Sequence, residues 1–472
     1  MRLALPRGML GEDLRSKALL ARLMRPFTRV HPDEAATVVL MTGCAFALLT
    51  AYYLLKIVRE PLILTGGGAA VKLYARAGQG LLMVAVVHFY GQLARRVGRV
   101  KLLAIVFLFF ISNLAVFAVL AGTGLSTGLG FGLAFFLWVG VFSYTVVAQF
   151  WALAADIYTE EQGKRLFPVI GGGSSIGAVV GALFARWLMQ FGVQALMTTA
   201  IVILLGCVGV IVWIERRAAA SHVAGPHEDK HPDEPVADES AWHLLARDRY
   251  LLCIAGLVVF LNWVNSSGEY LLDQALTTGA GAAAAAAGID RQHYIGVFKA
   301  DYSFWYSAIG VVLQLFAVSR IFKRVGVRNA LFVMPIFAFG AYGLASLLPV
   351  LAVIRLVKIG ENSLQYSLQD TTRNALFLVT SRVEKFVGKT AVDTIAVRLG
   401  AVMSSVTVFI GTSLGWSIAT FIVINVGLAL AWLGFVLLIR TEHKRRSTEE
   451  PAEIATEPHS GARPDHVAVG AR

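Results

Sequence analysis

Long apolar blocks alternate with short polar segments along the whole chain. Each block holds about 20 mostly hydrophobic residues, which is the length that an α-helix needs to cross a hydrocarbon core of roughly 30 Å. The blocks fall at 36–58, 75–95, 101–121, 129–156, 167–189, 194–214, 250–275, 294–320, 328–347, 350–376, 391–413 and 416–439. The pattern predicts an all-α integral membrane protein with about 12 transmembrane helices.

The composition agrees with this class and excludes several others. Of the 472 residues, 57% are hydrophobic and 15% are charged, whereas soluble domains are roughly 45–50% apolar and about 25% charged. A net charge of +12 is typical of nucleic-acid binding. Most basic residues lie in loops between apolar blocks, however, so we expect no nucleic-acid partner. The three cysteines have no metal-ligand spacing and no nucleophile–base pair is evident, so we expect no metal, no cofactor and no enzymatic activity.

Positive charge is concentrated in every second loop. Clusters of Lys and Arg follow the second, fourth, sixth, eighth, tenth and last blocks, and the other loops carry few, with Lys72 and Arg291 as isolated exceptions. In membrane proteins the cytoplasmic loops carry the excess of basic residues. The alternation therefore predicts an even number of spans with both termini in the cytoplasm. We expect a multi-pass protein of the bacterial inner membrane.

The two halves of the chain resemble each other. Residues 92–101 follow the second block and residues 319–328 follow the eighth, and the two segments align with the tripeptide Arg-Val-Gly in register. We expect a cytoplasmic N-terminal segment (1–34), a six-helix half (35–215), a cytoplasmic linker (216–246), a second six-helix half (247–440) and a disordered tail (441–472). Parallel six-helix halves joined by a long loop are the plan of the major facilitator fold. The motif at 91–99 resembles the loop between helices two and three of that superfamily.

Several charged residues interrupt the apolar blocks. An ionisable group inside a span costs roughly 2.5–3.5 kcal/mol on insertion scales, and it persists where it faces a cavity or a partner. In the expected fold, helices 1, 4, 7 and 10 line a central cavity. Three of these carry charges, so Lys56, Glu269 and Lys358 are the leading cavity residues. We interpret Arg59, Glu60 and Asp393 as helix-end anchors that reach the interface.

Polar and aromatic residues near these charges complete a candidate substrate site. The predicted substrate-binding residues are Lys56, Glu269, Lys358, Glu361, Asn362, Tyr366 and Gln149. A separate pattern, Gly173, Gly177 and Gly181, forms a ridge of small residues four apart. Such a ridge is typical of close packing between membrane helices. It is not a phosphate loop, because the Lys-Ser/Thr ending is missing.

Three segments resemble the nucleotide transporter family, the non-mitochondrial ATP/ADP antiporters of plastids and obligate intracellular bacteria. They are residues 51–60, 150–167 and 366–377, the last continuing through 384–393. In this resemblance Lys56 matches the lysine of the family's first helix, and Glu269 matches the glutamate of the seventh. The family's acid of the fourth helix falls at Val139, and its lysine of the eleventh falls at Ala401. The resemblance therefore implies family membership and leaves the substrate open.

These observations predict a secondary transporter for an anionic metabolite, with a nucleotide as the first candidate. Lys56 and Lys358 would attract the anion, and Glu269 would couple transport by pairing with a lysine or by binding a proton. The alternatives are a proton-coupled carrier of an unrelated solute and a transporter-derived membrane protein that does not transport. We expect a monomer whose partners are the lipid bilayer and the small-molecule substrate.

Overall fold

The computed structural model describes residues 31–97, 99–124, 128–220, 247–377, 380, 388–389 and 392–454. The first half contains α2 (Pro32–Gly66), α3 (Gly68–Arg96), α4 (Arg99–Gly122), α5 (Leu129–Ile157), α6 (Glu160–Leu188), the turn η2 (Met189–Phe191) and α7 (Val193–Ala220). The second half contains α9 (Arg249–Ala286), α10 (Arg291–Val312), α11 (Val318–Ala330), α12 (Val333–Leu347), α13 (Leu351–Leu364), α14 (Asp370–Leu376), α16 (Val397–Ser413) and α17 (Ile418–Ile454). Three π-helical segments also lie in this half, η3 (Leu313–Ala317), η4 (Gln365–Gln369) and η7 (Val392–Ala396).

The described helices account for about 12 membrane spans, as the sequence predicted. Ten of them are long and apolar enough to cross a bilayer. The shorter apolar helix α12 provides an eleventh. The continuous rod of α13, η4 and α14 provides the twelfth, and its charged residues keep its mean hydropathy low. The all-α membrane fold is thus confirmed.

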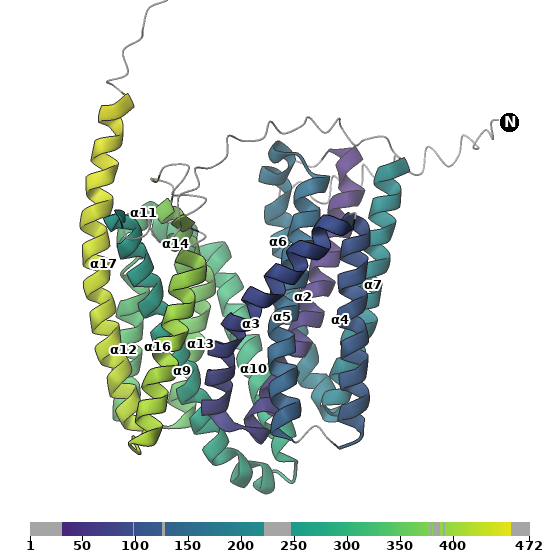
Figure 1. Ribbon diagram of the computed structural model, residues 1–472. Helices are drawn as coiled ribbons and strands as arrows, with labels where there is room; N and C mark the ends of the chain where they lie inside the picture. The colour runs from purple at the N-terminus through teal and green to yellow at the C-terminus, as the bar shows by residue number, and fades with distance from the viewer. Residues whose placement is uncertain are drawn as a thin grey trace, which may run out of the picture.

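The two halves stand side by side, with α2–α7 in one and α9–α17 in the other (Figure 1). The described chain begins and ends on the same side of the bundle, which we call the terminal end, and the opposite side is the distal end. Within each half the first helix packs on the fourth, fifth and sixth spans: α2 on α5, α6 and α7, and α9 on α13, α16 and α17. The halves therefore repeat one packing plan. They meet where α10 packs on α2 and α6, and where α3 packs on α9 and α16.

Glycines permit the tightest of these contacts. A Cβ on Gly177 of α6 would lie 2.3 Å from the backbone oxygen of Phe46 in α2. Likewise, a Cβ on Gly400 of α16 would lie 2.6 Å from the backbone oxygen of Val259 in α9. The Thr50 hydroxyl of α2 donates a hydrogen bond to the Gly177 carbonyl at 3.2 Å. The glycine ridge of α6 thus packs closely against α2, as predicted.

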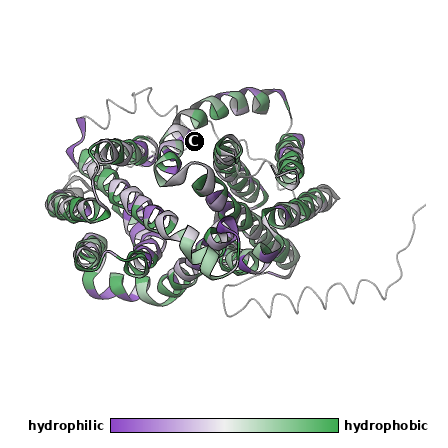
Figure 2. Cartoon of the chain, turned by 90° about the horizontal axis from the view of Figure 1, so that it is seen from below, coloured by the Kyte–Doolittle hydropathy of each residue, from purple (hydrophilic) through white to green (hydrophobic). Residues whose placement is uncertain are grey.

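Hydrophobic residues dominate the periphery of the bundle, and hydrophilic residues gather in the middle of the view along its axis (Figure 2). Large apolar side chains such as Phe89, Val119, Val202 and Leu437 are more than half exposed. Such a surface is stable against lipid, where there is no cost for exposing apolar groups. The polar side chains of the spans therefore form their hydrogen bonds and ion pairs inside the bundle.

Helix boundaries differ from the predicted blocks at several points. The helix α3 begins at Gly68, seven residues before the predicted block, so Lys72 lies in a helix rather than in a loop. The helix α6 begins at Glu160, where the Thr159 and Gln162 side chains cap each other's backbone N–H groups. Charged and small residues lower the hydropathy at these helix starts, so the predicted apolar blocks did not include them. Residues 1–30, 221–246 and 455–472, including most of the expected terminal segment, linker and tail, lie outside the described residues.

Candidate functional site

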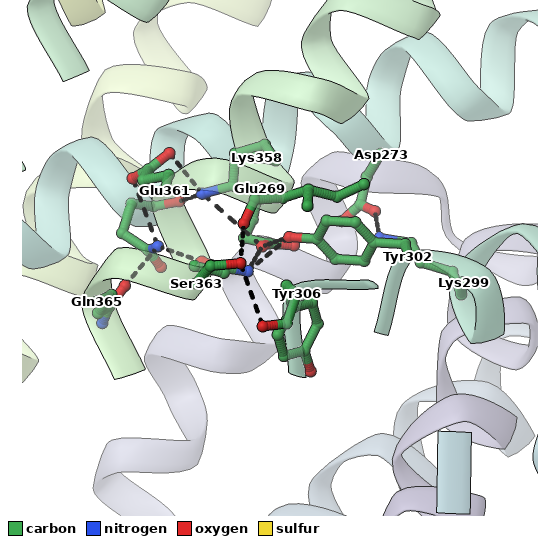
Figure 3. A network of polar contacts seen from close by, with 12 residues as sticks. Glu269, Asp273, Lys299, Tyr302, Tyr306, Lys358, Glu361, Ser363 and Gln365 are labelled. Carbon is green, nitrogen blue, oxygen red and sulfur yellow. Dashed lines mark hydrogen bonds and ion pairs between the residues drawn. The ribbon is translucent and has the colours of Figure 1, made fainter. Parts of the chain in front are cut away.

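A cluster of charged and polar side chains joins α9, α10, α12, α13 and η4 in the second half (Figure 3). We call it the central cluster: Asn265, Glu269, Tyr302, Tyr342, Lys358, Glu361, Asn362 and Gln365. Glu269 Oε1 accepts hydrogen bonds from the Tyr302 hydroxyl at 2.6 Å and from the Asn362 amide at 2.9 Å. Lys358 Nζ lies 3.7 Å from the same oxygen. Glu269 of α9 is thus held by side chains from two other helices, α10 and α13.

Lys358 and Glu361 form the most buried pair of the cluster. Lys358 Nζ donates to Glu361 Oε2 at 2.9 Å, and the Tyr342 hydroxyl donates to the same oxygen at 2.6 Å. The side chains of Lys358 and Glu361 are 0% and 1% exposed. Since a buried ion pair is tolerated only when its remaining hydrogen-bonding capacity is also satisfied, the tyrosine is part of the pair. A ligand cannot touch Lys358 or Glu361 unless the cluster rearranges.

Asn265 links the cluster to the π-helical segment η4. Its amide nitrogen lies 2.9 Å from Asn362 Oδ1 and 2.8 Å from Gln365 Oε1, and its backbone carbonyl accepts a hydrogen bond from Lys358 Nζ at 3.2 Å. Gln365 is the first residue of η4, and Tyr366 follows it. π-Helical turns are rare and occur mostly at functional sites. This widened turn carries Gln365, which contacts Asn265 of the central cluster, and Tyr366, which lies near Lys56 of α2.

Lys56 stands apart from the cluster with aromatic rather than acidic neighbours. Its Nζ donates a hydrogen bond to the Tyr306 hydroxyl at 2.8 Å. The same nitrogen lies 4.9 Å from the ring centroid of Tyr53, 5.3 Å from that of Tyr306 and 5.9 Å from that of Tyr366. Within the described ranges no carboxylate forms an ion pair with Lys56. Because α2 belongs to the first half and Tyr306 to the second, this lysine also lies where the halves meet.

The structure brings most of the predicted site residues together. Glu269, Lys358, Glu361 and Asn362 are in direct contact, and Tyr366, 53% exposed, packs on Tyr306 beside Lys56 at a centroid distance of 5.7 Å. Gln149 of α5 is buried, but neither of its side-chain amide atoms has a hydrogen-bond partner in the part of the chain that the structure describes. No hydrogen bond of the described residues therefore joins the Gln149 side chain to the central cluster. Sequence reasoning missed Tyr302, Tyr306 and Tyr342, because a tyrosine in an apolar block has no signal that separates packing from hydrogen bonding.

A second group of charges joins the two halves towards the distal end. We call it the distal ring: Glu60 of α2, Lys72 of α3, Asp273 of α9 and Lys299 of α10. Lys72 Nζ lies 2.6 Å from Asp273 Oδ2, and Lys299 Nζ lies 3.6 Å from Glu60 Oε2, so two ion pairs cross between halves. Lys72 also pairs with Glu60, and Lys299 with Asp273, each within one half. All four residues are buried.

The distal ring corrects the interpretation of Glu60 as a helix-end anchor. The helix α2 continues to Gly66, so Glu60 lies one and a half turns before its end and is buried against two lysines. Arg59 lies beside it, half-buried, with its guanidinium 4.7 Å from the ring centroid of Phe136. The prediction failed because hydropathy ended the first block at residue 58. A buried charge pairs with an opposite charge, and Lys72 was the unrecognised partner.

The ring and the central cluster are continuous. Asp273 follows Glu269 by four residues on α9, so both lie on one face of that helix. Lys299 Nζ lies 5.3 Å from the ring centroid of Tyr302, whose hydroxyl binds Glu269. A shift of α10 relative to α9 would therefore alter both groups at once.

The central cluster, Lys56 and the distal ring gather the buried charges of the described chain near the contact between the two halves. Among the described residues no group of three or more His, Cys, Asp or Glu could hold a metal ion. Two six-helix halves meet at a set of balanced charges placed in the interior of a membrane protein, where such charges mark substrate or ion pathways. The fold and the site define the class of secondary transporters.

Comparison with known proteins agrees with this class. The family model of the Major Facilitator Superfamily matches residues 35–379, and the chain belongs to that superfamily. The crystal structure of the nucleoside transporter NupG is similar in fold, with a TM-score of 0.60 and 10% identity over 87% of this chain and 98% of that one. A bacterial homologue of the lysosomal transporter Spinster, in an inward-facing unoccupied conformation, has a TM-score of 0.57 and 12% identity over 88% of this chain and 99% of that one.

One curated relative is similar in sequence. It is the ADP,ATP carrier protein 1 of Chlamydia pneumoniae, which is 21% identical over 290 residues. The match covers 53% of this chain and 55% of the carrier, so it spans only about half the length of that relative.

Proposed function

We propose that this chain carries an organic anion across the membrane by alternating access, with a nucleotide as the first candidate. The observation that carries the proposal is the environment of Lys56. In the described structure Lys72, Lys299 and Lys358 each pair with a carboxylate, whereas Lys56 contacts tyrosines and forms no ion pair with a carboxylate. A half-buried ammonium without a counter-ion attracts an anion strongly, because water screens the charge poorly there.

The tyrosines around Lys56 favour an anion that also carries an aromatic ring. Tyr366 is 53% exposed and its ring is tilted by 31° from that of Tyr306. Exposed aromatic rings stack on nucleobases, and each stacked base contributes about 1–3 kcal/mol. A nucleotide would thus place its phosphates at Lys56 and its base against Tyr366. The partial sequence similarity to an ADP,ATP carrier supports this choice of candidate.

In this proposal the central cluster positions Glu269 and does not bind phosphate directly. Lys358 is fully buried and already neutralised by Glu361, whereas the Glu269 side chain is 16% exposed. Glu269 is therefore the member of this acid–lysine group that a ligand can reach. When an anion occupies Lys56, a negative Glu269 would be repelled towards Lys358, and this movement would pass to α10 through Tyr302.

The distal ring supports the alternating-access part of the proposal. The first half contributes Glu60 and Lys72, and the second half contributes Asp273 and Lys299. If the halves part at the distal end, each half retains one lysine paired with one carboxylate. Opening then breaks the two cross-half ion pairs but leaves no buried charge without a partner, which would cost several kcal/mol. A ring of this kind can open and close reversibly.

A specific observation favours proton coupling as a second candidate. Two carboxylates, Glu269 and Glu361, lie within 4 Å of one lysine, Lys358, so the group carries a net negative charge when both are ionised. One proton would balance it. Uptake into lipid vesicles that contain the purified protein distinguishes the two candidates. Only nucleotide exchange needs a counter-substrate inside the vesicle.

Ligand-induced thermal stabilisation of the purified protein tests the proposal. We expect ATP, ADP or AMP to raise the melting temperature of the wild type, and Lys56→Ala to weaken this binding roughly ten- to a hundredfold, as loss of a charged hydrogen bond of about 1.5–3 kcal/mol requires. Adenosine serves as the matched ligand without phosphate, and its effect should be insensitive to Lys56→Ala. Equal nucleotide binding by Lys56→Ala would exclude this site. Stabilisation by a dicarboxylate but by no nucleotide would keep the anion site and exclude the nucleotide.

A further inference from the structure

An apolar groove with two arginines lies on the outside of the second half, near the terminal end. It has a volume of about 410 Å³ and is lined by Val312, Leu313, Phe316, Ala317, Arg320, Ile321, Arg324 and Val325. These residues belong to the continuous rod of α10, η3 and α11. Their spacing of four places the apolar side chains and the two arginines along one side of the rod. The groove shares no residue with the central cluster or the distal ring.

The surroundings of the groove show that it faces lipid. The span that contains it, Arg291–Ala330, is the least buried of the ten candidate spans. Val312 and Phe316 are 55% and 56% exposed, and Leu315 beside them is 66% exposed. The π-helical segment η3 lies in the middle of the groove. Water cannot fill such an apolar surface at membrane depth, so an acyl chain is the natural occupant of its apolar part.

The two arginines mark one end of the groove as a phosphate site. Arg320 Nη1 donates to the Phe316 carbonyl at 2.7 Å, and among the described residues its other N–H groups have no hydrogen-bond partner. In the described structure neither Arg320 nor Arg324 pairs with a carboxylate. The chain leaves helical geometry at Gly326, with φ of 75°, two residues after Arg324 and six after Arg320, so both arginines lie within about two turns of this break. Arginine binds phosphate with a two-pronged geometry and is costly in hydrocarbon without such a partner.

We propose that this groove binds an anionic phospholipid, with its headgroup phosphate on Arg320 and Arg324 and one acyl chain along Val312, Leu313 and Phe316. A free phosphate would lack the apolar contacts, and a zwitterionic lipid would lack the net charge. The site contacts the transport machinery through η3, which packs on η4, the segment that carries Tyr366. Bound lipid therefore stabilises one arrangement of the two π-helical segments. The inference does not depend on the nature of the transported substrate.

Titration of the purified full-length protein with lipid in detergent, followed by native mass spectrometry and thermal unfolding, tests the site. Phosphatidylglycerol should bind and raise the melting temperature, phosphatidylcholine of the same acyl chains should do so less, and inorganic phosphate should have no effect. Arg320→Ala combined with Arg324→Ala should weaken phosphatidylglycerol binding by about 25-fold, since each basic residue contributes roughly fivefold.

The matched control is the pair Lys323→Ala and Arg328→Ala. Both residues are exposed and basic and lie in the same segment, but neither lines the groove. The control pair should retain most of the binding. An equal loss in both double variants would show diffuse attraction of lipid to a basic surface and overturn the site. Phe316→Ser, which leaves the arginines in place, should also weaken binding, and unchanged binding by Phe316→Ser would overturn the placement of the acyl chain.

Discussion

Neutralising Asp273 tests how firmly the distal ring holds the two halves together. Asp273 pairs with both lysines of the ring, and its side chain is 2% exposed. Asp273→Asn keeps the shape but leaves Lys299, also 2% exposed, with Glu60 at 3.6 Å as its remaining acid. Breaking one partner of a buried pair costs about 3–5 kcal/mol. This cost destabilises mainly the state in which the two halves touch at the distal end, which we call the closed state. When the halves separate there, Lys299 is exposed to water and no longer needs a buried partner.

The expected consequence is a shift of the equilibrium between conformations. A differential cost of about 3–5 kcal/mol corresponds to roughly a 10²- to 10⁴-fold change in the ratio of closed to open molecules. Double electron–electron resonance measures the separation of the halves between spin labels at Thr123, directly after the distal end of α4, and at Ala285, at the distal end of α9. The labels require a background in which the three native cysteines are replaced. We expect a short distance in the wild type and a longer one in Asp273→Asn.

Asp301→Asn provides the matched control for this experiment. Asp301 also joins the halves, through an ion pair with Arg186 at 2.9 Å, but the Arg186 side chain is 57% exposed. Exposed ion pairs contribute only about 0–1 kcal/mol. The control should therefore leave the distance distribution close to that of the wild type. An unchanged distribution in Asp273→Asn, or an equal shift in both variants, would refute the reasoning.

Three further predictions concern stability and topology. Glu361→Gln should lower the melting temperature more than Glu269→Gln, because it leaves the fully buried Lys358 without its closest acid; the reverse order in thermal unfolding would contradict this. Gly177→Ala should reduce the yield of monodisperse protein because its Cβ would meet the Phe46 carbonyl. Gly172→Ala has open space around its Cβ and should be tolerated. Equal yields of the two variants would exclude close packing of α2 on α6. Reporter fusions at Ser126 and Pro232 should read outside and inside the cell, and the same side for both would exclude the expected topology.

The spans could be predicted from the sequence because lipid imposes a simple rule. About 20 apolar residues are needed for each crossing, and the loops carry alternating charge. The rule loses resolution at helix ends that carry partnered charges. At the start of α3, Lys72 belongs to the helix but lowers its local hydropathy, so the predicted block began after it. The sequence around Lys72 does not identify Asp273 as its partner, because the two residues are 201 positions apart.

The candidate site could be predicted only in part for a related reason. Glu269, Lys358 and Glu361 stand out because charges in apolar blocks are costly and therefore conspicuous. The tyrosines that bind them, such as Tyr302 and Tyr342, are common in membrane helices and have no distinguishing spacing. The π-helical segment that presents Tyr366 depends on backbone hydrogen bonding, which hydropathy does not report. That no carboxylate of the described chain pairs with Lys56 also became visible only when distant helices were brought together.

Transport by Lys56→Ala is the most direct test of the central claim that this lysine binds the transported anion. The assay is uptake of labelled nucleotide, or of another anion identified by thermal stabilisation, into cells with matched membrane levels of each variant. We expect Lys56→Ala to lose roughly ten- to a hundredfold in apparent affinity. Arg59→Ala should retain most uptake, because Arg59 pairs with Glu60 and packs on Phe136. Normal uptake by Lys56→Ala together with loss in Arg59→Ala would contradict the account.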